Sequence, residues 1–233
     1  SPTQVKKYAS KAKTHGKSIG LRVNPQCSTQ KDQDIYDPCA PGSRLGTTIE
    51  NFDESLLPLL DGLHFHTLCE QNSDDLEVTV KAFEEKFGKY LKGMKWLNLG
   101  GGHHITRKDY DIQRLIRIIK YLRSTYEVDI YLEPGEAVVL NAGFLIAKVL
   151  EIVHNEIDIA ILDTSVACHM PDVIEMPYRP PLQNSGEDMA LYTMVKTNTF
   201  NGMRLPDIVW RSTDGNIKIV RTFGYEDFKS RLS

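Results

Sequence analysis

The sequence predicts an α/β fold in which part of a β/α barrel is followed by a mainly antiparallel β domain. Short apolar runs alternate with helical stretches over the first 140 residues, a pattern typical of parallel β/α units. After Pro134, short β-type runs follow one another without a long helix between them, which favours antiparallel pairing. We therefore expect a barrel portion over residues 1–140 and a β domain over residues 141–233.

Each expected element has its own signal in the chain. Buried strands are expected at Ser18–Asn24, Leu63–His66, Trp96–Leu99 and Ile130–Leu132. Helices are expected from about Ser73 to Tyr90, with Ser73 as the N-cap, and from about Asp109 to Tyr126. Later β-type runs are expected at Val138–Val153, Asp158–Asp163, Ile174–Tyr178, Met189–Val195, Asp207–Trp210 and Ile217–Phe223.

The number of expected parallel strands is too small for a closed barrel. A barrel that fills its own interior with side chains needs about eight strands. Either the fold is not a barrel, or strands are absent from this sequence. We expect the second, with N-terminal barrel strands outside the 233 residues.

Composition and charge exclude several classes of function. The formal net charge is −3 and the pI is near 6.2, so nothing favours a nucleic-acid partner. Four cysteines are scattered without CxxC or other metal-type spacing. No apolar run reaches the length of about 18 residues that a membrane span requires. We expect a reduced, cytoplasmic protein without a membrane partner.

The strongest local motif is a run of three glycines, Gly100, Gly101 and Gly102, directly after an expected strand. Consecutive backbone N–H groups in such a turn suit a phosphate, and a Cβ would hold the anion away. A flexible turn without a ligand is the alternative. The run does not match the GxGxxG fingerprint of dinucleotide sites.

Two further motifs lie at the ends of expected strands. Glu133 stands at the carboxyl end of Ile130–Leu132, where a barrel strand presents its side chain to the catalytic mouth, although it could equally cap a neighbouring loop. His64 and His66 share one face of their strand. They could bind a metal, place one imidazole against a cofactor ring, or form an ordinary interior hydrogen bond.

These motifs, taken in order, resemble the alanine-racemase-like superfamily of ornithine and diaminopimelate decarboxylases, which use pyridoxal 5′-phosphate (PLP). The matching segments are HFH at 64–66, LGGG at 99–102, EPGE at 133–136, DTS at 163–165 and the late YTMVKTNTFNG at 192–202. Within that superfamily, YDPCAPGSRLG at 36–46, HMPD at 169–172, MPYRP at 176–180 and FGYEDF at 223–228 resemble the carboxynorspermidine decarboxylase family.

The resemblance implies a role for each matched residue. Gly100, Gly101 and Gly102, with the hydroxyl of Tyr192, would hold the cofactor phosphate. His66 would lie against the pyridine ring, and Glu133 would pair with the pyridine nitrogen and keep it protonated. Arg22 matches a family arginine near the cofactor, with a structural ion pair as the alternative. The family also implies a homodimer with shared active sites, and no metal.

Position 136 departs from the wider superfamily, whose members typically have an arginine after EPG that helps to bind the phosphate. Here the residue is Glu136. The carboxylated triamine that this family decarboxylates carries distal ammonium groups, which are costly to desolvate without an acidic partner. We expect Glu136, with Asp172 and Glu175, to receive these amines; a salt bridge between surface loops is the alternative.

Two features of the family pattern are missing from the sequence. No lysine matches the family's cofactor-binding lysine, and the loop that bears the partner-directed cysteine is absent between Gly186 and Glu187. We expect both to lie in segments outside this sequence. The expected reaction is decarboxylation of carboxynorspermidine to norspermidine, of carboxyspermidine to spermidine, or both. The alternatives are a decarboxylase of diaminopimelate or ornithine, a metal-dependent barrel hydrolase, and an inactive PLP-binding relative.

Overall fold

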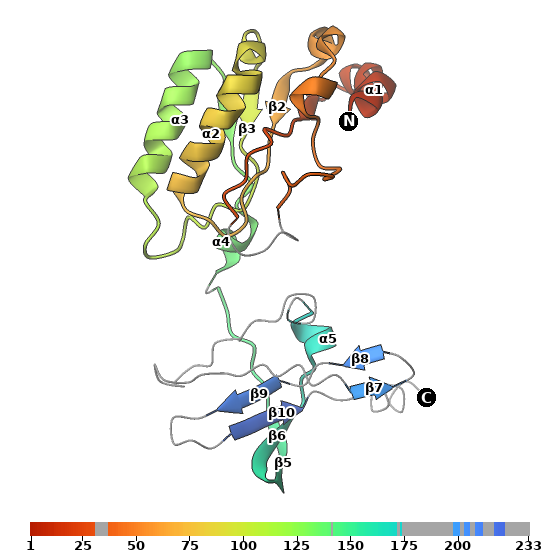
Figure 1. Ribbon diagram of the computed structural model, residues 1–233, viewed down its shortest axis with the longest axis vertical. Helices are drawn as coiled ribbons and strands as arrows, with labels where there is room; N and C mark the ends of the chain where they lie inside the picture. The colour runs from red at the N-terminus through yellow and green to blue at the C-terminus, as the bar shows by residue number, and fades with distance from the viewer. Residues whose placement is uncertain are drawn as a thin grey trace. The chain divides into compact units, whose positions relative to one another are not determined.

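The structure is a computed structural model of the 233-residue chain (Figure 1). It describes residues 1–30, 37–140, 142–171 and 173. It also describes the backbone of four later strands at 198–200, 203–205, 208–211 and 217–221, while for 157–159 only the backbone is described. The chain divides into two compact units, Ser1–Gly143 and Phe144–Ser233, each of which is treated by itself. None of the described helices is both long and apolar enough to cross a membrane.

The first unit is built on a parallel four-stranded sheet. Its strands are β1 (Gly20–Arg22), β2 (Gly62–His64), β3 (Trp96–Asn98) and β4 (Asp129–Tyr131), in the order β1-β2-β3-β4. Neighbouring strands pair in register, so that Arg22, His64, Asn98 and Tyr131 form one row across the sheet. A parallel sheet with helices between the strands confirms the predicted α/β class.

Helices cover one face of this sheet. They are α1 (Pro2–Thr14), α2 (Ser73–Phe87) and α3 (Ile112–Tyr126), with short 3-10 turns η2 (Ile49–Asn51), η3 (Glu54–Leu59) and η4 (Gly88–Leu91). Figure 1 shows α2 and α3 side by side along the strands. The central strand residues Leu21, Leu63 and Leu97 are buried in one apolar core that includes Phe83 and Leu122 of these helices. Burial of this face supplies the main free energy that folds the unit.

The opposite face of the sheet carries a large aromatic side chain over glycines. A Cβ added at Gly62 or Gly20 would lie 2.2 Å from the indole of Trp96, so both positions need glycine because the ring occupies that space. Tyr131 meets the indole edge-on at 6.2 Å and is half exposed. No described helix covers this face.

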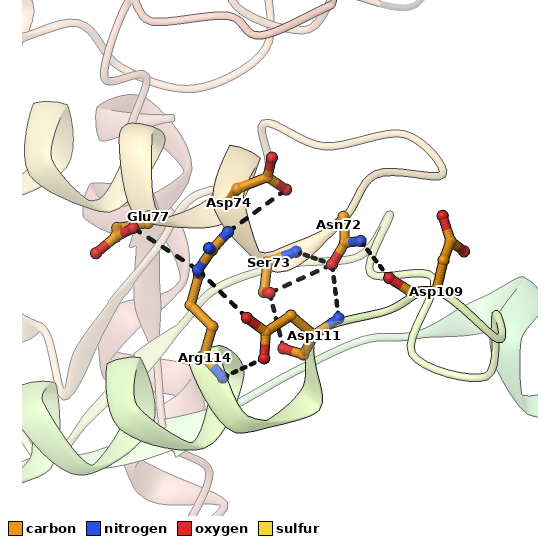
Figure 2. Close-up of polar contacts among 7 residues, drawn as sticks. All are labelled: Asn72, Ser73, Asp74, Glu77, Asp109, Asp111 and Arg114. Carbon is orange, nitrogen blue, oxygen red and sulfur yellow. Dashed lines mark hydrogen bonds and ion pairs between the residues drawn. The ribbon is translucent and has the colours of Figure 1, made fainter.

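A polar network ties the start of α2 to the start of α3 (Figure 2). The Asn72 side-chain oxygen accepts from the backbone N–H of Ser73 and of Asp111, and its amide donates to the carbonyl of Asp109. Asp111 in turn caps α3 by accepting from the backbone N–H of Arg114. The N-cap of α2 is therefore Asn72, and the prediction that Ser73 caps the helix is wrong by one residue.

The glutamate motif continues into a short helix, α4 (Gly135–Val139). This corrects the predicted β-type run over Val138–Val153, because its first residues are helical and its strand begins at Val149. The carbonyl of Ala137 accepts a hydrogen bond from Thr106 at 2.9 Å, and Ala137 is buried. These contacts hold the start of the helix against the loop that follows β3.

The second unit contains a four-stranded sheet in the order β5-β6-β10-β9 and a separate pair of strands. The strands are β5 (Val149–Asn155), β6 (Ile157–Leu162), β7 (Asn198–Phe200), β8 (Met203–Leu205), β9 (Ile208–Arg211) and β10 (Ile217–Arg221). The pair β6 and β10 is parallel, whereas β5 with β6, β9 with β10 and β7 with β8 are antiparallel. A four-residue helix, α5 (Val166–His169), begins at its N-cap Ser165.

Candidate active site

The carboxyl ends of the four parallel strands bring the sequence motifs together. Arg22, His64 and Asn98 share a row of the sheet, and each points to the face opposite the buried leucines. One pleat further along the chain follow His66, Gly100 and Glu133. The Glu133 backbone N–H donates to the Gly100 carbonyl at 2.8 Å. The glycine turn and the EPGE segment are therefore direct neighbours, as one ligand touching both would require.

Asn98 holds the carboxylate of Glu133, and His64 lies beside it. The Asn98 amide donates to its Oε1 at 2.8 Å, and Nε2 of His64 lies 3.7 Å from its Oε2. The Glu133 side chain is 52% exposed, so its oxygens stay accessible to a ligand although the side chain is anchored. Burial lowers the pKa of His64, in spite of the nearby Glu133 charge, which acts in the opposite direction.

His66 lies beside the glycine turn. Its Nδ1 accepts a hydrogen bond from the Gly101 N–H at 3.3 Å, and a Cβ at Gly101 would lie 3.1 Å from its Cε1. Burial and the charge of Arg22 lower the pKa of His66. Both effects favour a neutral imidazole. Because Nδ1 accepts from the Gly101 N–H, the proton of this neutral ring is on Nε2. Arg22 donates to the His66 carbonyl at 3.4 Å, and burial lowers the pKa of its guanidinium.

Gly100 and Gly102 are required by the neighbouring loop as well as by backbone conformation. Gly100 and Gly102 have φ values of +73° and +80°, which favour glycine. A Cβ at Gly100 would lie 2.6 Å from the Phe65 carbonyl oxygen, and one at Gly102 would lie 2.1 Å from that of Leu68. The turn therefore packs on the backbone that follows β2. This contact excludes a side chain at these positions more strictly than the need for space around a bound anion would.

Two backbone N–H groups of the turn already donate hydrogen bonds to side chains of the protein. The Gly100 N–H donates to Oδ1 of Asn98 at 2.8 Å, and the Gly101 N–H donates to His66. In the part of the turn that the structure describes, the N–H of Gly102 is the donor left for an anion.

A cavity of about 430 Å³ opens beside His66 among the loops at the strand ends. Its lining includes Gly102, Gly135 and the side chains of Arg22, Asp37, Glu70, His103, His104 and Glu136. Because this lining has three carboxylates and only one guanidinium, the electrostatic potential in the cavity is negative. Burial, followed by the charges of Glu70 and Glu136, raises the pKa of the Cys69 thiol, another lining residue.

His103 is the most buried titratable side chain of this lining, with 2% exposure. Neither of its ring nitrogens has a hydrogen-bond partner among the described residues. Burial lowers its pKa to about 4, and the nearby backbone of Leu99 and Gly100 acts in the opposite direction. His103 is therefore neutral at pH 7. Its place directly after the glycine turn is the one signal in the sequence that points to it.

The next histidine connects the turn to α4. Nε2 of His104 lies 3.8 Å from Oε1 of Glu136, and the His104 side chain is 11% exposed. Glu136 itself is half exposed at 51%. The carboxylate thus stands at the rim of the cavity, where a ligand can reach it. Asp172, Glu175 and Tyr192, the other expected site residues, lie outside the described residues.

His64, His66 and Glu133 also have the geometry of a possible metal site. Their ligand atoms lie within 4.8 Å of one another. The same arrangement would place an imidazole and a carboxylate around a flat heteroaromatic ring. Geometry alone leaves both interpretations open.

Comparison with known proteins shows the family to which the chain belongs. The chain is 38% identical over 270 residues to carboxynorspermidine/carboxyspermidine decarboxylase from Campylobacter jejuni subsp. jejuni, covering 94% of this chain and 70% of the relative. The chain belongs to the carboxynorspermidine/carboxyspermidine decarboxylase family. A crystal structure of carboxynorspermidine decarboxylase from Campylobacter jejuni, complexed with norspermidine, matches with a TM-score of 0.67 and 36% identity. That match covers 99% of this chain and 73% of the crystallised one.

Other relatives define the breadth of the decarboxylase group. A carboxyaminopropylagmatine decarboxylase from Synechocystis sp. is 36% identical, and the alignment covers 97% of this chain and 69% of that protein. A diaminopimelate decarboxylase structure matches with a TM-score of 0.64 at 16% identity, over 94% of this chain and 57% of that one, which shows the fold alone. No family model matches the chain. The named relatives are decarboxylases, and decarboxylases are carboxy-lyases.

Proposed function

We propose that this protein decarboxylates carboxynorspermidine to norspermidine, carboxyspermidine to spermidine, or both, with PLP as its cofactor. The observation that carries the proposal is the contact between the glycine turn and the anchored Glu133, beside a neutral His66, in a member of this decarboxylase family. The proposed reaction is a step of polyamine biosynthesis.

The residues present fit the cofactor at its ring end. PLP supplies an electron sink for the carbon that loses carbon dioxide, and this requires a protonated pyridine nitrogen. Glu133 would keep that nitrogen protonated, because a carboxylate paired with a ring nitrogen favours its charged form. The flat, uncharged imidazole of His66, whose orientation is fixed by the Gly101 N–H, would pack against the ring.

At the phosphate end the available donors are fewer than the motif suggests. Gly102 offers its N–H to an anion. The amides of Gly100 and Gly101 would join it only by leaving Asn98 and His66. Tyr192 is proposed as a further donor.

The cavity with negative potential is proposed to receive the distal amines of the substrate. Glu136 stands at its rim, and Asp37 and Glu70 add two carboxylates from other strand-end loops. An ammonium group removed from water needs such a partner, whereas a short, uncharged side chain does not. We include Asp172 and Glu175 in the same role.

We further propose that additional strands close the parallel sheet into a barrel and that two copies share their active sites. Among the described residues, β1 and β4 each have only one neighbouring strand. The face that carries Trp96 and Arg22 is without a covering helix in the described part of the chain, as the interior face of a barrel would be. The lysine that binds the cofactor would then come from one of the additional strands.

Other substrates and one other class of enzyme are the alternatives to this function. The Synechocystis relative favours a second candidate, carboxyaminopropylagmatine, because it is similar over nearly the whole chain. The metal cluster of His64, His66 and Glu133 would support a hydrolase, but it gives no role to the glycine turn. Ornithine and diaminopimelate are the remaining candidates within the decarboxylase class.

Product analysis tests the proposal directly. The purified protein is supplied with PLP and, in separate reactions, with carboxynorspermidine, carboxyspermidine, carboxyaminopropylagmatine, ornithine and diaminopimelate. We expect norspermidine or spermidine as the preferred product. Preference for another substrate would reassign the reaction, while activity that depends on a bound divalent metal and not on PLP would contradict the proposed chemistry.

A further inference from the structure

One amide side chain connects the two halves of the candidate active site. Oδ1 of Asn98 accepts the Gly100 N–H at 2.8 Å, and Nδ2 of the same side chain donates to Glu133 Oε1 at 2.8 Å. The Glu133 backbone N–H returns to the Gly100 carbonyl, also at 2.8 Å. The three residues therefore form a closed ring of hydrogen bonds at the ends of β3 and β4.

The partners fix the orientation of this amide. A backbone N–H needs an acceptor and a carboxylate needs a donor, so a reversed amide would set donor against donor and acceptor against acceptor. An asparagine provides one of each on a short, nearly rigid stem. An alanine would lose both bonds, and an aspartate would keep only the bond to Gly100.

We propose that Asn98 is the positioning residue of this site: it orients the Glu133 carboxylate toward the cofactor ring while it holds the glycine turn in place. The inference rests on the proposed function, because it gives Glu133 its task. Asn98 itself does not need to touch the cofactor or the substrate. Its effect is to keep a half-exposed carboxylate in one orientation, which otherwise costs side-chain entropy on each binding event.

The variant Asn98→Asp separates this role from general stability. The new carboxylate still accepts the Gly100 N–H, but its second oxygen faces Glu133. Two carboxylates in contact share one proton more readily than they ionise together, so the first proton is taken up at higher pH than usual. Once the pair holds that proton, its O–H restores the donor to Glu133.

The affinity for PLP is measured by equilibrium dialysis from about pH 8 to about pH 5. Relative to wild type, Asn98→Asp should bind about ten-fold more weakly near pH 8 and recover most of this loss near pH 5. Asn98→Ala should be weaker by a ratio that changes little with pH. Asn51→Asp, an exposed position in η2, is the matched charge control and should follow wild type.

The titratable and charged groups around Glu133 are the same in wild type and in each variant. Glu133 is faced by His64 and His66 from the end of β2, by Arg22 from β1 and by His103 from the loop after β3. Because these groups are present in wild type and variant alike, the ratio of the two affinities removes the part of their titration that the substitution leaves unchanged. A ratio that does not change with pH overturns the inference.

The outcomes also distinguish the inference from the proposed function. Saturable binding by wild type that Asn98→Asp leaves unchanged overturns the inference alone. Absence of saturable PLP binding by wild type overturns both. Recovery of Asn98→Asp on acidification supports both.

A second measurement covers the case in which Asn98→Asp is poorly folded. Denaturant midpoints without cofactor are compared for Asn98→Asp, Glu133→Gln and the double variant at about pH 8. In the double variant, the amide introduced at position 133 can donate to the carboxylate introduced at position 98, so the midpoint should rise above that of Asn98→Asp alone. Additive effects of the two substitutions would show that the side chains at 98 and 133 are not coupled, and would overturn the inference.

Discussion

The buried His103 predicts a specific loss of stability on acidification. In the unfolded chain a histidine takes up its proton near pH 6.5, whereas burial lowers the pKa of His103 to about 4 in the folded protein. Between these values the unfolded state binds more protons than the folded state. The free energy of unfolding therefore falls as the pH falls through this window, and this loss is nearly absent at pH 7.

The size of the effect follows from the difference between the two pKa values. For this one side chain the loss is about 2 kcal/mol at pH 5 and about 3 kcal/mol at pH 4. Burial also lowers the pKa values of His64 and His66, which act in the same direction. A variant is therefore needed to isolate the contribution of His103.

The perturbation is His103→Gln, which removes the titrating group. Urea unfolding is followed by far-ultraviolet circular dichroism, because the long helices α1, α2 and α3 all belong to the first unit. Between pH 7 and pH 5, wild type should lose about 2 kcal/mol more than the variant. His15→Gln, at an exposed histidine after α1, should follow wild type. If wild type and His103→Gln lost the same free energy of unfolding between pH 7 and pH 5, the assignment of this effect to His103 would be refuted.

Three further predictions concern the remaining parts of the account. Glu133→Ala should lower kcat by about 100-fold or more with cofactor still bound, because the ring nitrogen loses the group that keeps it protonated; a near-normal kcat would remove Glu133 from this role. Glu136→Gln should raise KM about ten-fold for polyamine-length substrates and little for ornithine. Glu85→Gln, at an exposed position, is the control. An equal rise in KM for both kinds of substrate would contradict amine binding by Glu136. Asn72→Ala should lower the free energy of unfolding by about 1–2 kcal/mol in urea, because it loses the cap bond from the Ser73 N–H and the two hydrogen bonds that join α2 to the start of α3. A loss no larger than that of Asn51→Ala would contradict the importance of this junction.

The parallel strands were predictable from the sequence because their apolar runs are short and their ends carry polar motifs. All four lie within or next to the expected ranges, and the helix ending at Tyr126 ends as predicted. The cap of α2 was placed one residue late because Asn72 and Ser73 are both good capping residues. Only the tertiary contact of Asn72 with Asp111 decides between them.

Other features depend on contacts that one sequence does not reveal. The run after Pro134 is rich in β-branched residues, but the packing of Ala137 and its bond to Thr106 favour a helical start. The glycine turn was found from its composition, whereas its close approach to the Phe65 and Leu68 carbonyls required the structure. Asn98 looked like an ordinary strand residue until its register with His64 placed it beside Glu133.

A crystal structure of the protein with PLP shows whether Glu133 pairs with the pyridine nitrogen. We expect this nitrogen about 3 Å from a Glu133 carboxylate oxygen, with the ring against the imidazole of His66 and the phosphate near Gly102. A metal ion held between His64, His66 and Glu133, or PLP bound away from Glu133, would contradict this expectation.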